Sequence, residues 1–396
     1  MDPRTPSPSI ARVAAGRLLA CAARAMPSSS DPTPAPSSPA AGRTSLRVRL
    51  LLSLSSVLAF VLLGECVARV REPGPFSLVD TNPYLTGQKS HEVRHRPGFE
   101  GRWDSTWYRI NERGMRGPDI DWSLGDEELR VVCVGDSCTF GKGVLEEASW
   151  PRQLERLLQE ALPEGQRARV ANLGINGGDA TSAHELLREQ GLALRPDLVV
   201  YGANVNDFPN AVEAVNQKVF NEAPLKRLIP QGILDPLNRS ALYRWARSLY
   251  YQSRRAQDWA AAEALAASMG EAPAESPAWA RQRARVEAIQ RDALAAGARC
   301  AIVLFPYESQ IYLDSYDTSA IERLAALCAE LEIPFIDLAE VFREHFRSAG
   351  EDLFIPGDRY HPNAGGYTLV ARALLRLART EGLLEAEESS AEDTPR

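Results

Sequence analysis

Short apolar runs alternate with amphipathic helical patterns between residues 129 and 381, and this alternation restricts the possible fold more than any other feature of the chain. The runs are rich in β-branched residues and are continuously apolar: LRVVCVG, ARVANLG, PDLVVYG, RCAIVLFP and IPFIDL. Helical patterns such as WPRQLERLLQEAL, TSAHELLREQGLAL and IERLAALCAEL lie between them. Continuously apolar strands separated by helices indicate a parallel sheet that helices cover on both faces. Ligands of such sheets bind beyond the carboxyl ends of the strands, so reactive residues are expected directly after the runs.

The first run ends in GDSCTFG, residues 135–141, which places Ser137 just past a buried strand. A glycine-bracketed turn at this point can present the serine hydroxyl above the sheet and near a helix N-terminus, as a nucleophile requires. The spacing differs from the G-x-S-x-G nucleophile elbow. It also differs from a phosphate-binding P-loop, because Gly143 stands where that loop needs Ser or Thr. A simple turn closed by an Asx-type hydrogen bond is the alternative interpretation.

A candidate general base follows the last run. His361, one of five histidines, lies in GDRYHPN directly before the final helical pattern. Asp358, three residues upstream, can hold the imidazole by Nδ1 and leave Nε2 to accept the serine proton. The spacing therefore predicts a short local unit with the chemistry of a catalytic triad.

Donors for an oxyanion are also available at the ends of the second and third runs. The second run continues into NLGINGG, where the backbone N–H of Gly177 is a candidate. The third continues into GANVND, where Asn204 or Asn206 supplies a side-chain amide. Taken singly, glycine and asparagine at these positions are also ordinary loop residues.

The four blocks GDSCTFG, NLGINGG, GANVND and DRYHPNAGG occur in the order and placement of the SGNH hydrolases, also called GDSL esterases or lipases. The chain resembles this family over about residues 100–381, and its YRINERGMRGPD segment resembles the membrane-anchored bacterial members. The resemblance implies a three-layer α/β sandwich around a five-stranded parallel, flavodoxin-like sheet. It implies no metal or organic cofactor.

The resemblance also assigns roles to individual residues. It implies that Ser137 is the nucleophile and that Asp358 and His361 complete the catalytic set. It implies an oxyanion hole formed by Ser137, Gly177 and Asn206. Asn204 is the alternative, because the third block here is longer than the usual Gly-x-Asn-Asp.

A competing motif is HEVRH, residues 91–95, which matches the H-E-x-x-H pattern of zinc metalloproteases. It lies between Gly87 and Pro97, a window too short for the buried helix that such a zinc site needs, and no third ligand follows at a recognisable spacing. A solvated polar turn is the expected structure.

A 19-residue apolar stretch, Leu50–Ala68, precedes these motifs and has arginines at both edges. As a helix it spans about 28 Å, close to the hydrocarbon thickness of a bilayer. We expect a single-pass membrane anchor, with the arginine-rich N-terminal side cytoplasmic and the catalytic domain extracytoplasmic, in the periplasm. A cleaved signal peptide and a buried core helix are the alternatives.

The predicted organisation has four parts: a disordered cytoplasmic leader at 1–44, the anchor at 45–71, a hydrolase domain at 72–383 and a disordered acidic tail at 384–396. A helical insertion is expected at about 208–297. Residues 1–49 hold seven basic and two acidic side chains, so the net charge of −7 becomes −12 for the remainder. That charge argues against a nucleic-acid partner. The six cysteines show no metal-binding spacing, and Cys133 and Cys300 are expected in the core.

Together these features predict a membrane-anchored serine esterase that hydrolyses carboxylic esters through an acyl-enzyme, with acetyl groups on glycans as a candidate substrate. An extracytoplasmic polysaccharide O-acyltransferase on the same fold is the first alternative. A non-catalytic module that binds a carbohydrate or a protein partner is the second.

Overall fold

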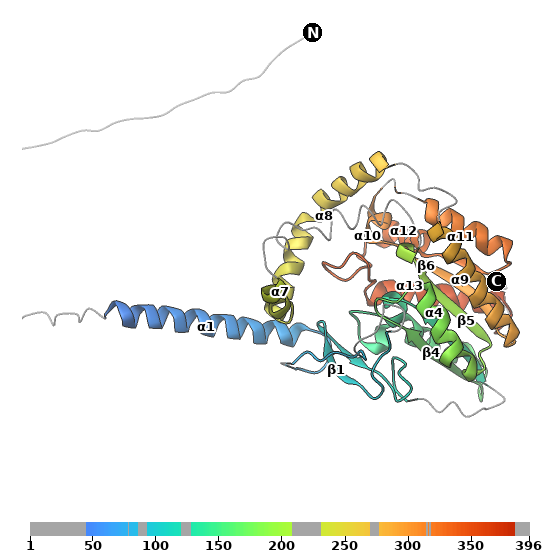
Figure 1. The fold of residues 1–396 in the computed structure, drawn as a ribbon, viewed down its shortest axis with the longest axis horizontal. Coiled ribbons are helices and arrows are strands. Elements are labelled where there is room, and N and C mark those ends of the chain that lie inside the picture. Colours follow the sequence, from blue (N-terminus) through green and yellow to red (C-terminus); the bar gives the residue numbers. More distant parts are fainter. Residues whose placement is uncertain are drawn as a thin grey trace, which may run out of the picture. The chain divides into compact units, whose positions relative to one another are not determined.

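The computed structural model describes residues 45–77, 79–85, 93–119, 128–207, 231–269, 277–313, 316 and 318–384 (Figure 1). The predicted leader, and the predicted tail from residue 385 on, lie outside these residues. Internal contacts divide the chain into residues 1–55 and residues 56–396. The fold and the candidate site described below belong to the second unit.

The core of this unit is a five-stranded sheet: β3 (Glu128–Gly135), β4 (Arg167–Gly174), β5 (Leu198–Asn204), β6 (Arg299–Phe305) and β7 (Phe335–Asp337). All neighbours are parallel, and the spatial order is β4-β3-β5-β6-β7. The expected five-stranded, flavodoxin-like sheet is therefore confirmed. Its strands read as continuous apolar runs because both faces are covered.

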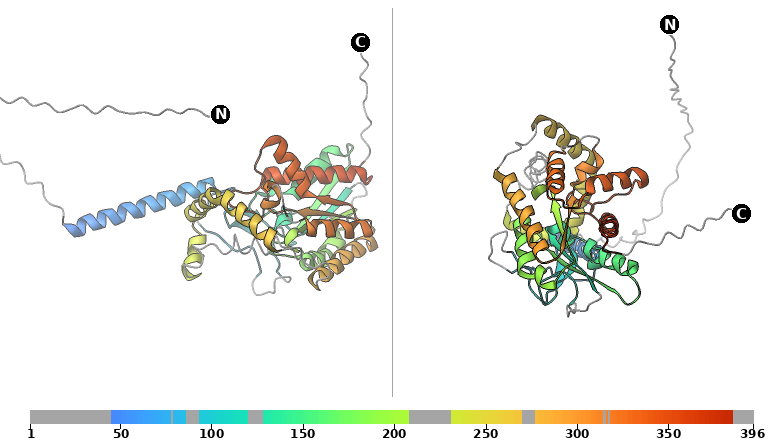
Figure 2. Two further views of the ribbon diagram at one scale, coloured as in Figure 1. Left: turned by 90° about the horizontal axis from the view of Figure 1, so that it is seen from above. Right: turned by 90° about the vertical axis from the view of Figure 1, so that its right-hand side faces the viewer.

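Two helical layers cover the sheet (Figure 2). One consists of α3 (Trp150–Ala161), α12 (Leu338–Ala349) and α13 (Ala364–Thr380). The other contains α4 (Ala180–Leu186), α9 (Pro277–Ala295) and α11 (Ser319–Glu330). The helix expected over 181–194 is regular only in α4 and continues as a π-turn, η3 (Leu187–Gly191), and a 3-10 turn, η4 (Leu192–Leu194). Shorter helical turns are α2 (Ser137–Phe140), η2 (Glu146–Ala148), η5 (Val205–Asp207) and α10 (Glu308–Tyr312).

An antiparallel hairpin, β1 (Glu100–Trp103) and β2 (Thr106–Arg109), precedes the sheet. Its turn residues Asp104 and Ser105 have φ angles of 44° and 69°, as the tight turns favoured in hairpins require. The sequence pattern did not predict this hairpin, because Asp-Ser is a weak signal for such a turn.

Helices α7 (Gln231–Asn238) and α8 (Ala241–Met269) fall, with part of α9, in the segment where an insertion was expected. Residues 208–230 and 270–276 of that segment lie outside the described residues.

Helix α1 (Leu46–Arg71) is, among the described residues, the one helix long and apolar enough to cross a membrane, a test that a signal sequence also passes. Within the second unit its side chains from Val57 to Leu63 are largely exposed, whereas Ala68 and Arg69 are buried.

Candidate active site

Ser137 is the first residue of α2, a single helical turn that follows β3 directly. The preceding Asp136 caps this turn, because its carboxylate accepts a hydrogen bond from the backbone N–H of Cys138 at 2.8 Å. The turn ends at Gly141, whose φ of 80° is left-handed. A serine at the N-terminus of a helix has its hydroxyl and its own N–H on the same side, which suits a nucleophile that also donates to an oxyanion.

Three glycines lie side by side beneath this turn. Gly174 at the end of β4 and Gly202, two residues before the end of β5, are both in register with Gly135 at the end of β3. A Cβ atom on Gly174 would stand 2.1 Å from the backbone nitrogen of Phe140, and one on Gly202 would stand 2.1 Å from Thr139 Oγ1. The turn that carries Ser137 thus lies closer to the sheet than any side chain at these positions would allow.

Ser137, His361 and Asp358 form a continuous hydrogen-bonded series. Ser137 Oγ lies 2.8 Å from His361 Nε2, and His361 Nδ1 lies 2.6 Å from Asp358 Oδ2. The other carboxylate oxygen of Asp358 accepts backbone N–H bonds from Tyr360 and His361 at 2.9 and 3.1 Å. Burial alone would raise the pKa of Asp358, but His361, the nearby charge of Lys142 and these bonds hold it well below its usual value. Asp358 is therefore an anion that orients the imidazole.

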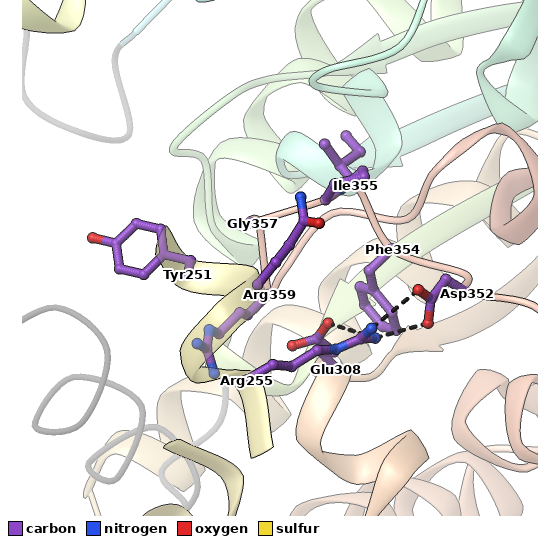
Figure 3. Close-up of a pocket in the computed structure, with 10 residues that line it drawn as sticks. Tyr251, Arg255, Glu308, Asp352, Phe354, Ile355, Gly357 and Arg359 are labelled. Carbon is purple, nitrogen blue, oxygen red and sulfur yellow. Dashed lines mark hydrogen bonds and ion pairs between the residues drawn. The ribbon is translucent and has the colours of Figure 1, made fainter. Parts of the chain in front are cut away.

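Helix α8 fastens the loop that carries Asp358 and His361 (Figure 3). Arg255 on α8 binds both carboxylate oxygens of Asp352 at 3.0 and 2.9 Å and Glu308 at 3.0 Å. Gly357 has a φ of 81°, and a Cβ atom there would lie 2.9 Å from Ser248 Cα of α8. These contacts border a cavity of about 270 Å³ and hold the loop against the helix. These contacts are not predictable from the sequence, since Arg255 and Asp352 are 97 positions apart.

Arg116 holds the other end of the turn that carries Ser137. Its buried guanidinium donates to the carbonyl oxygens of Phe140 and Gly141, and to that of Val144 at 2.5 Å. It also lies 4.9 Å from the ring centroids of Tyr108 and Phe140. Burial lowers the pKa of Arg116. The segment YRINERGMRGPD contains this arginine, but no role was predicted for it. Its partners become evident only in three dimensions.

The oxyanion candidates occupy distinct environments. Gly177 is exposed, with a φ of 78°, in a turn closed by the bond from Gly178 N–H to the Ile175 carbonyl at 3.0 Å. Asn204, the last residue of β5, is buried and donates its amide to Cys138 Sγ at 3.3 Å. Asn206 lies in the following turn, η5.

A buried carboxyl group, Asp207, supports the asparagine loop. It accepts hydrogen bonds from Tyr201 Oη at 2.9 Å and from the Asn204 N–H at 3.1 Å. Burial, together with the charge of Asp136, raises the pKa of Asp207 to about 8. Asp207 therefore holds its proton more strongly than an ordinary carboxyl group does.

Within the described residues, the H-E-x-x-H motif at 91–95 forms no zinc site. His91 and Glu92 lie outside the described residues. His95 is buried, not solvated as expected, because its ring stacks on Phe140 with centroids 4.7 Å apart. Burial lowers the pKa of His95 to about 4. Across the part of the chain that the structure describes, no three His, Cys, Asp or Glu side chains are grouped to hold a metal. Cys133 and Cys300 are buried in β3 and β6, as predicted.

Asp358 and His361 open onto a cleft of about 680 Å³. Its walls come from the end of α1, the tip of the β1–β2 hairpin, α8 and the loop that carries Asp358 and His361. Side chains that line it include Arg71, Lys142, Trp245, Arg247 and Tyr251. The aromatic residues Trp103, Trp107 and Tyr108 are not among the cleft-lining residues, and Tyr108 is buried.

Comparison with known proteins finds several that are similar to this chain. An acetylxylan esterase of Xylanibacter ruminicola is 27% identical over 118 residues, which cover 28% of this chain and 24% of that one. This chain thus matches about a quarter of that relative's length. Two solved structures were also found. A lipolytic protein of the G-D-S-L family from Desulfitobacterium hafniense is 16% identical, with 63% of this chain and 98% of that chain covered and a TM-score of 0.35. An acetylxylan esterase from Geobacillus stearothermophilus is 17% identical, with coverages of 64% and 94% and a TM-score of 0.38.

The model of the GDSL-like lipase/acylhydrolase family matches residues 133–369, from within β3 to within α13. This range contains the turn that carries Ser137, the row of Gly135, Gly174 and Gly202, and the loop that carries Asp358 and His361. Because the family model matches more than half of this chain, the chain belongs to the GDSL-like lipase/acylhydrolase family.

Proposed function

We propose that this protein is a serine esterase in which Ser137 is the nucleophile, His361 the general base and Asp358 the group that orients the imidazole. The observation that carries the proposal is the series of contacts from Ser137 Oγ to His361 Nε2 at 2.8 Å and from His361 Nδ1 to Asp358 at 2.6 Å. Membership of an acylhydrolase family supports the same reaction class.

The reaction has two halves. In the first, His361 Nε2 takes the proton of Ser137 as Oγ attacks the ester carbonyl, and the same proton then passes to the departing alcohol. In the second, His361 takes a proton from water, whose oxygen attacks the acyl-enzyme, and Ser137 regains a proton as the carboxylic acid leaves. Asp358 remains ionised throughout and stabilises the imidazolium, consistent with its lowered pKa.

The oxyanion of both tetrahedral intermediates accepts hydrogen bonds from the N–H of Ser137, the N–H of Gly177 and the amide of Asn206 in this proposal. Asn204 is the alternative amide. Its Nδ2 donates to Cys138 Sγ, which is a structural use of one of its hydrogens and favours Asn206.

For the whole protein, we propose attachment to a membrane through α1, with the catalytic domain on the extracytoplasmic side. The apolar length of α1 and the arginines that precede it support this topology. O-acetyl groups on glycans are the proposed substrate class, because acetylxylan esterases are among the similar proteins.

Labelling with a fluorophosphonate probe tests the nucleophile. Wild type is expected to be labelled, and Ser137→Ala is expected to lose both the label and the hydrolysis of 4-methylumbelliferyl acetate. Ser105→Ala is the matched control, because Ser105 lines the cleft onto which His361 opens but lies on the hairpin tip. Equal labelling of wild type and Ser137→Ala would refute the assignment.

A further inference from the structure

The end of helix α1 is built into the catalytic unit through a cap on α8. The carboxylate of Glu65 accepts hydrogen bonds from the Ser240 hydroxyl at 2.7 Å and from the N–H groups of Ala241 and Leu242 at 2.9 and 3.0 Å. These N–H groups begin α8 and have no partner within their own helix. The helices also approach closely, since a Cβ atom on Gly64 would stand 3.1 Å from a Leu242 methyl carbon.

A buried ion network strengthens the same junction. Arg69 of α1 pairs with Asp80 at 3.3 Å, and Arg244 of α8 pairs with the same Asp80 at 3.0 Å. Glu72 accepts bonds from Arg244 and from Arg102 of the hairpin, each at 3.0 Å. Because all three arginines are buried, these pairs are well shielded from solvent. The end of α1, the start of α8 and the hairpin therefore form one fixed structure.

This fixed structure is also a wall of the candidate active-site cleft. Ala68 and Arg71 line the same cleft as His361, and the Arg71 guanidinium lies 5.7 Å from the ring centroid of Trp245 on α8. From Leu63, where the continuously exposed apolar run of α1 ends, to Arg71 is eight residues, or about 12 Å along a helix, and Val67 and Val70 are exposed between them. The cleft thus begins close to the apolar part of α1.

Exposed apolar side chains concentrate around this wall. Outside α1, eight large hydrophobic residues of the described chain are exposed, and six of them lie in the segment after α1 or on α7 and α8: Phe76, Val79, Ile233, Trp245, Leu249 and Tyr250. Figures 1 and 2 show α7 and the start of α8 beside the end of α1, and Arg69 donates to the Arg239 carbonyl just after α7 at 2.6 Å. Apolar side chains accompanied by Trp, Tyr and Arg are typical of surfaces at the headgroup level of a bilayer.

We propose that the mouth of the cleft lies at the surface of the membrane that α1 crosses, and that the enzyme acts on an amphiphilic ester held in that membrane. The inference rests on the proposed esterase function and on insertion of α1. The reaction is the hydrolysis described above: water enters, the free acid leaves to the aqueous side, and the alcohol part of the ester remains in the bilayer. Arg71, Lys142 and Arg247 line the cleft and supply cationic donors for the polar headgroup.

The first test uses the full chain in vesicles of phosphatidylcholine and phosphatidylglycerol. The substrates are octadecyl and methyl glucosides acetylated at the same hydroxyl, which differ only in the tail. At equal total ester we expect the octadecyl ester to be hydrolysed faster by on the order of tenfold or more, because enzyme and ester share one surface. The double variant Phe76→Asp/Val79→Asp is expected to lose this preference but keep the methyl ester rate. Leu294→Asp, which charges an exposed leucine on α9, is expected to change neither rate.

Equal rates on the two esters would overturn the inference while leaving the esterase proposal intact, because that proposal is judged by fluorophosphonate labelling of Ser137. If neither glucoside is hydrolysed, a second measurement decides. The background for this measurement has Cys21 and Cys66 changed to serine. A nitrobenzoxadiazole dye attached to Val79→Cys in this background is expected to lose fluorescence to doxyl-labelled lipids. The same dye attached to Leu294→Cys is expected to keep its fluorescence. The other four cysteines are buried. The absence of quenching at position 79 would refute the proposed surface.

Discussion

Replacing Gly202 with alanine tests whether the row of Gly135, Gly174 and Gly202 sets the position of Ser137. The new Cβ atom would stand 2.1 Å from Thr139 Oγ1, whereas ordinary contact begins at 3.4 Å. One side chain must therefore move by about 1.3 Å, and the chain segment that carries Thr139 is the same turn that carries Ser137. Because Gly202 has an ordinary backbone φ, alanine adds no conformational strain of its own.

We expect the substitution to lower the free energy of unfolding by about 3 kcal/mol, the upper part of the range for overpacking a dense interior. Displacement of Ser137 from its 2.8 Å contact with His361 is expected to lower kcat by about a hundredfold. Removing the obstruction by Thr139→Ala leaves Thr139 Cβ at 3.5 Å from the new methyl, an ordinary contact. The double variant is therefore expected to recover about 2 kcal/mol as a coupling energy.

Urea denaturation of the four forms and their kcat values on 4-methylumbelliferyl acetate measure these effects. Thr139→Ala alone is expected to cost only about 1 kcal/mol, because within the described residues its hydroxyl has no hydrogen-bond partner. Gly174→Ala is the contrasting variant, since its Cβ would meet the backbone nitrogen of Phe140 and no side-chain truncation can make room. Wild-type stability of Gly202→Ala, or a double variant no better than the single one, would refute the reasoning.

Three further predictions concern the surroundings of Ser137. Asn206→Ala is expected to lower kcat about a hundredfold with little change in KM, as the loss of an oxyanion donor does. Asn204→Ala is expected instead to lower the urea midpoint, because the Asn204 amide donates to Cys138 Sγ. The opposite pattern would exchange the roles of the two asparagines. Because the pKa of Asp207 is raised, its protonated carboxyl group contributes its full stabilisation of the fold below about pH 4, and this contribution is lost as the pH rises towards 8. The Tm of Asp207→Asn relative to wild type is therefore expected to increase over that interval, and a pH-independent difference would contradict the raised pKa. Arg116→Lys is expected to destabilise the protein by about 3 kcal/mol in urea titrations, because the three donors of an ammonium share one nitrogen, whereas the guanidinium reaches these buried carbonyls from two separate nitrogens. A loss below about 1 kcal/mol would exclude that role.

The sheet and the reactive series were predictable because their signals are local. A strand buried on both faces is apolar at most positions, so β3 to β6 are visible as predominantly apolar runs. Asp358 and His361 are three residues apart, and Ser137 follows the first run directly. Once the sheet is parallel, the carboxyl ends of its strands share one edge, which brings such residues together.

The supports of the site were not predictable for the opposite reason. Arg116 and Arg255 resemble any surface arginine in the sequence, and their partners lie 24 and 97 positions away. The burial of His95 likewise depends on Phe140, which a short polar motif does not reveal. The role of the glycine row is visible only when β4, β3 and β5 are aligned in register.

The cap that Glu65 places on α8 has a consequence for how the chain is processed and expressed. A peptidase that removed α1 as an export signal by cutting between Glu65 and Glu72 would leave the first N–H groups of α8 and the Ser240 hydroxyl without their acceptor. A recombinant fragment that starts at residue 72 has the same defect and also lacks Arg69. Soluble fragments of this protein therefore need to begin before Glu65, with polar replacements on the exposed side of the remaining helix.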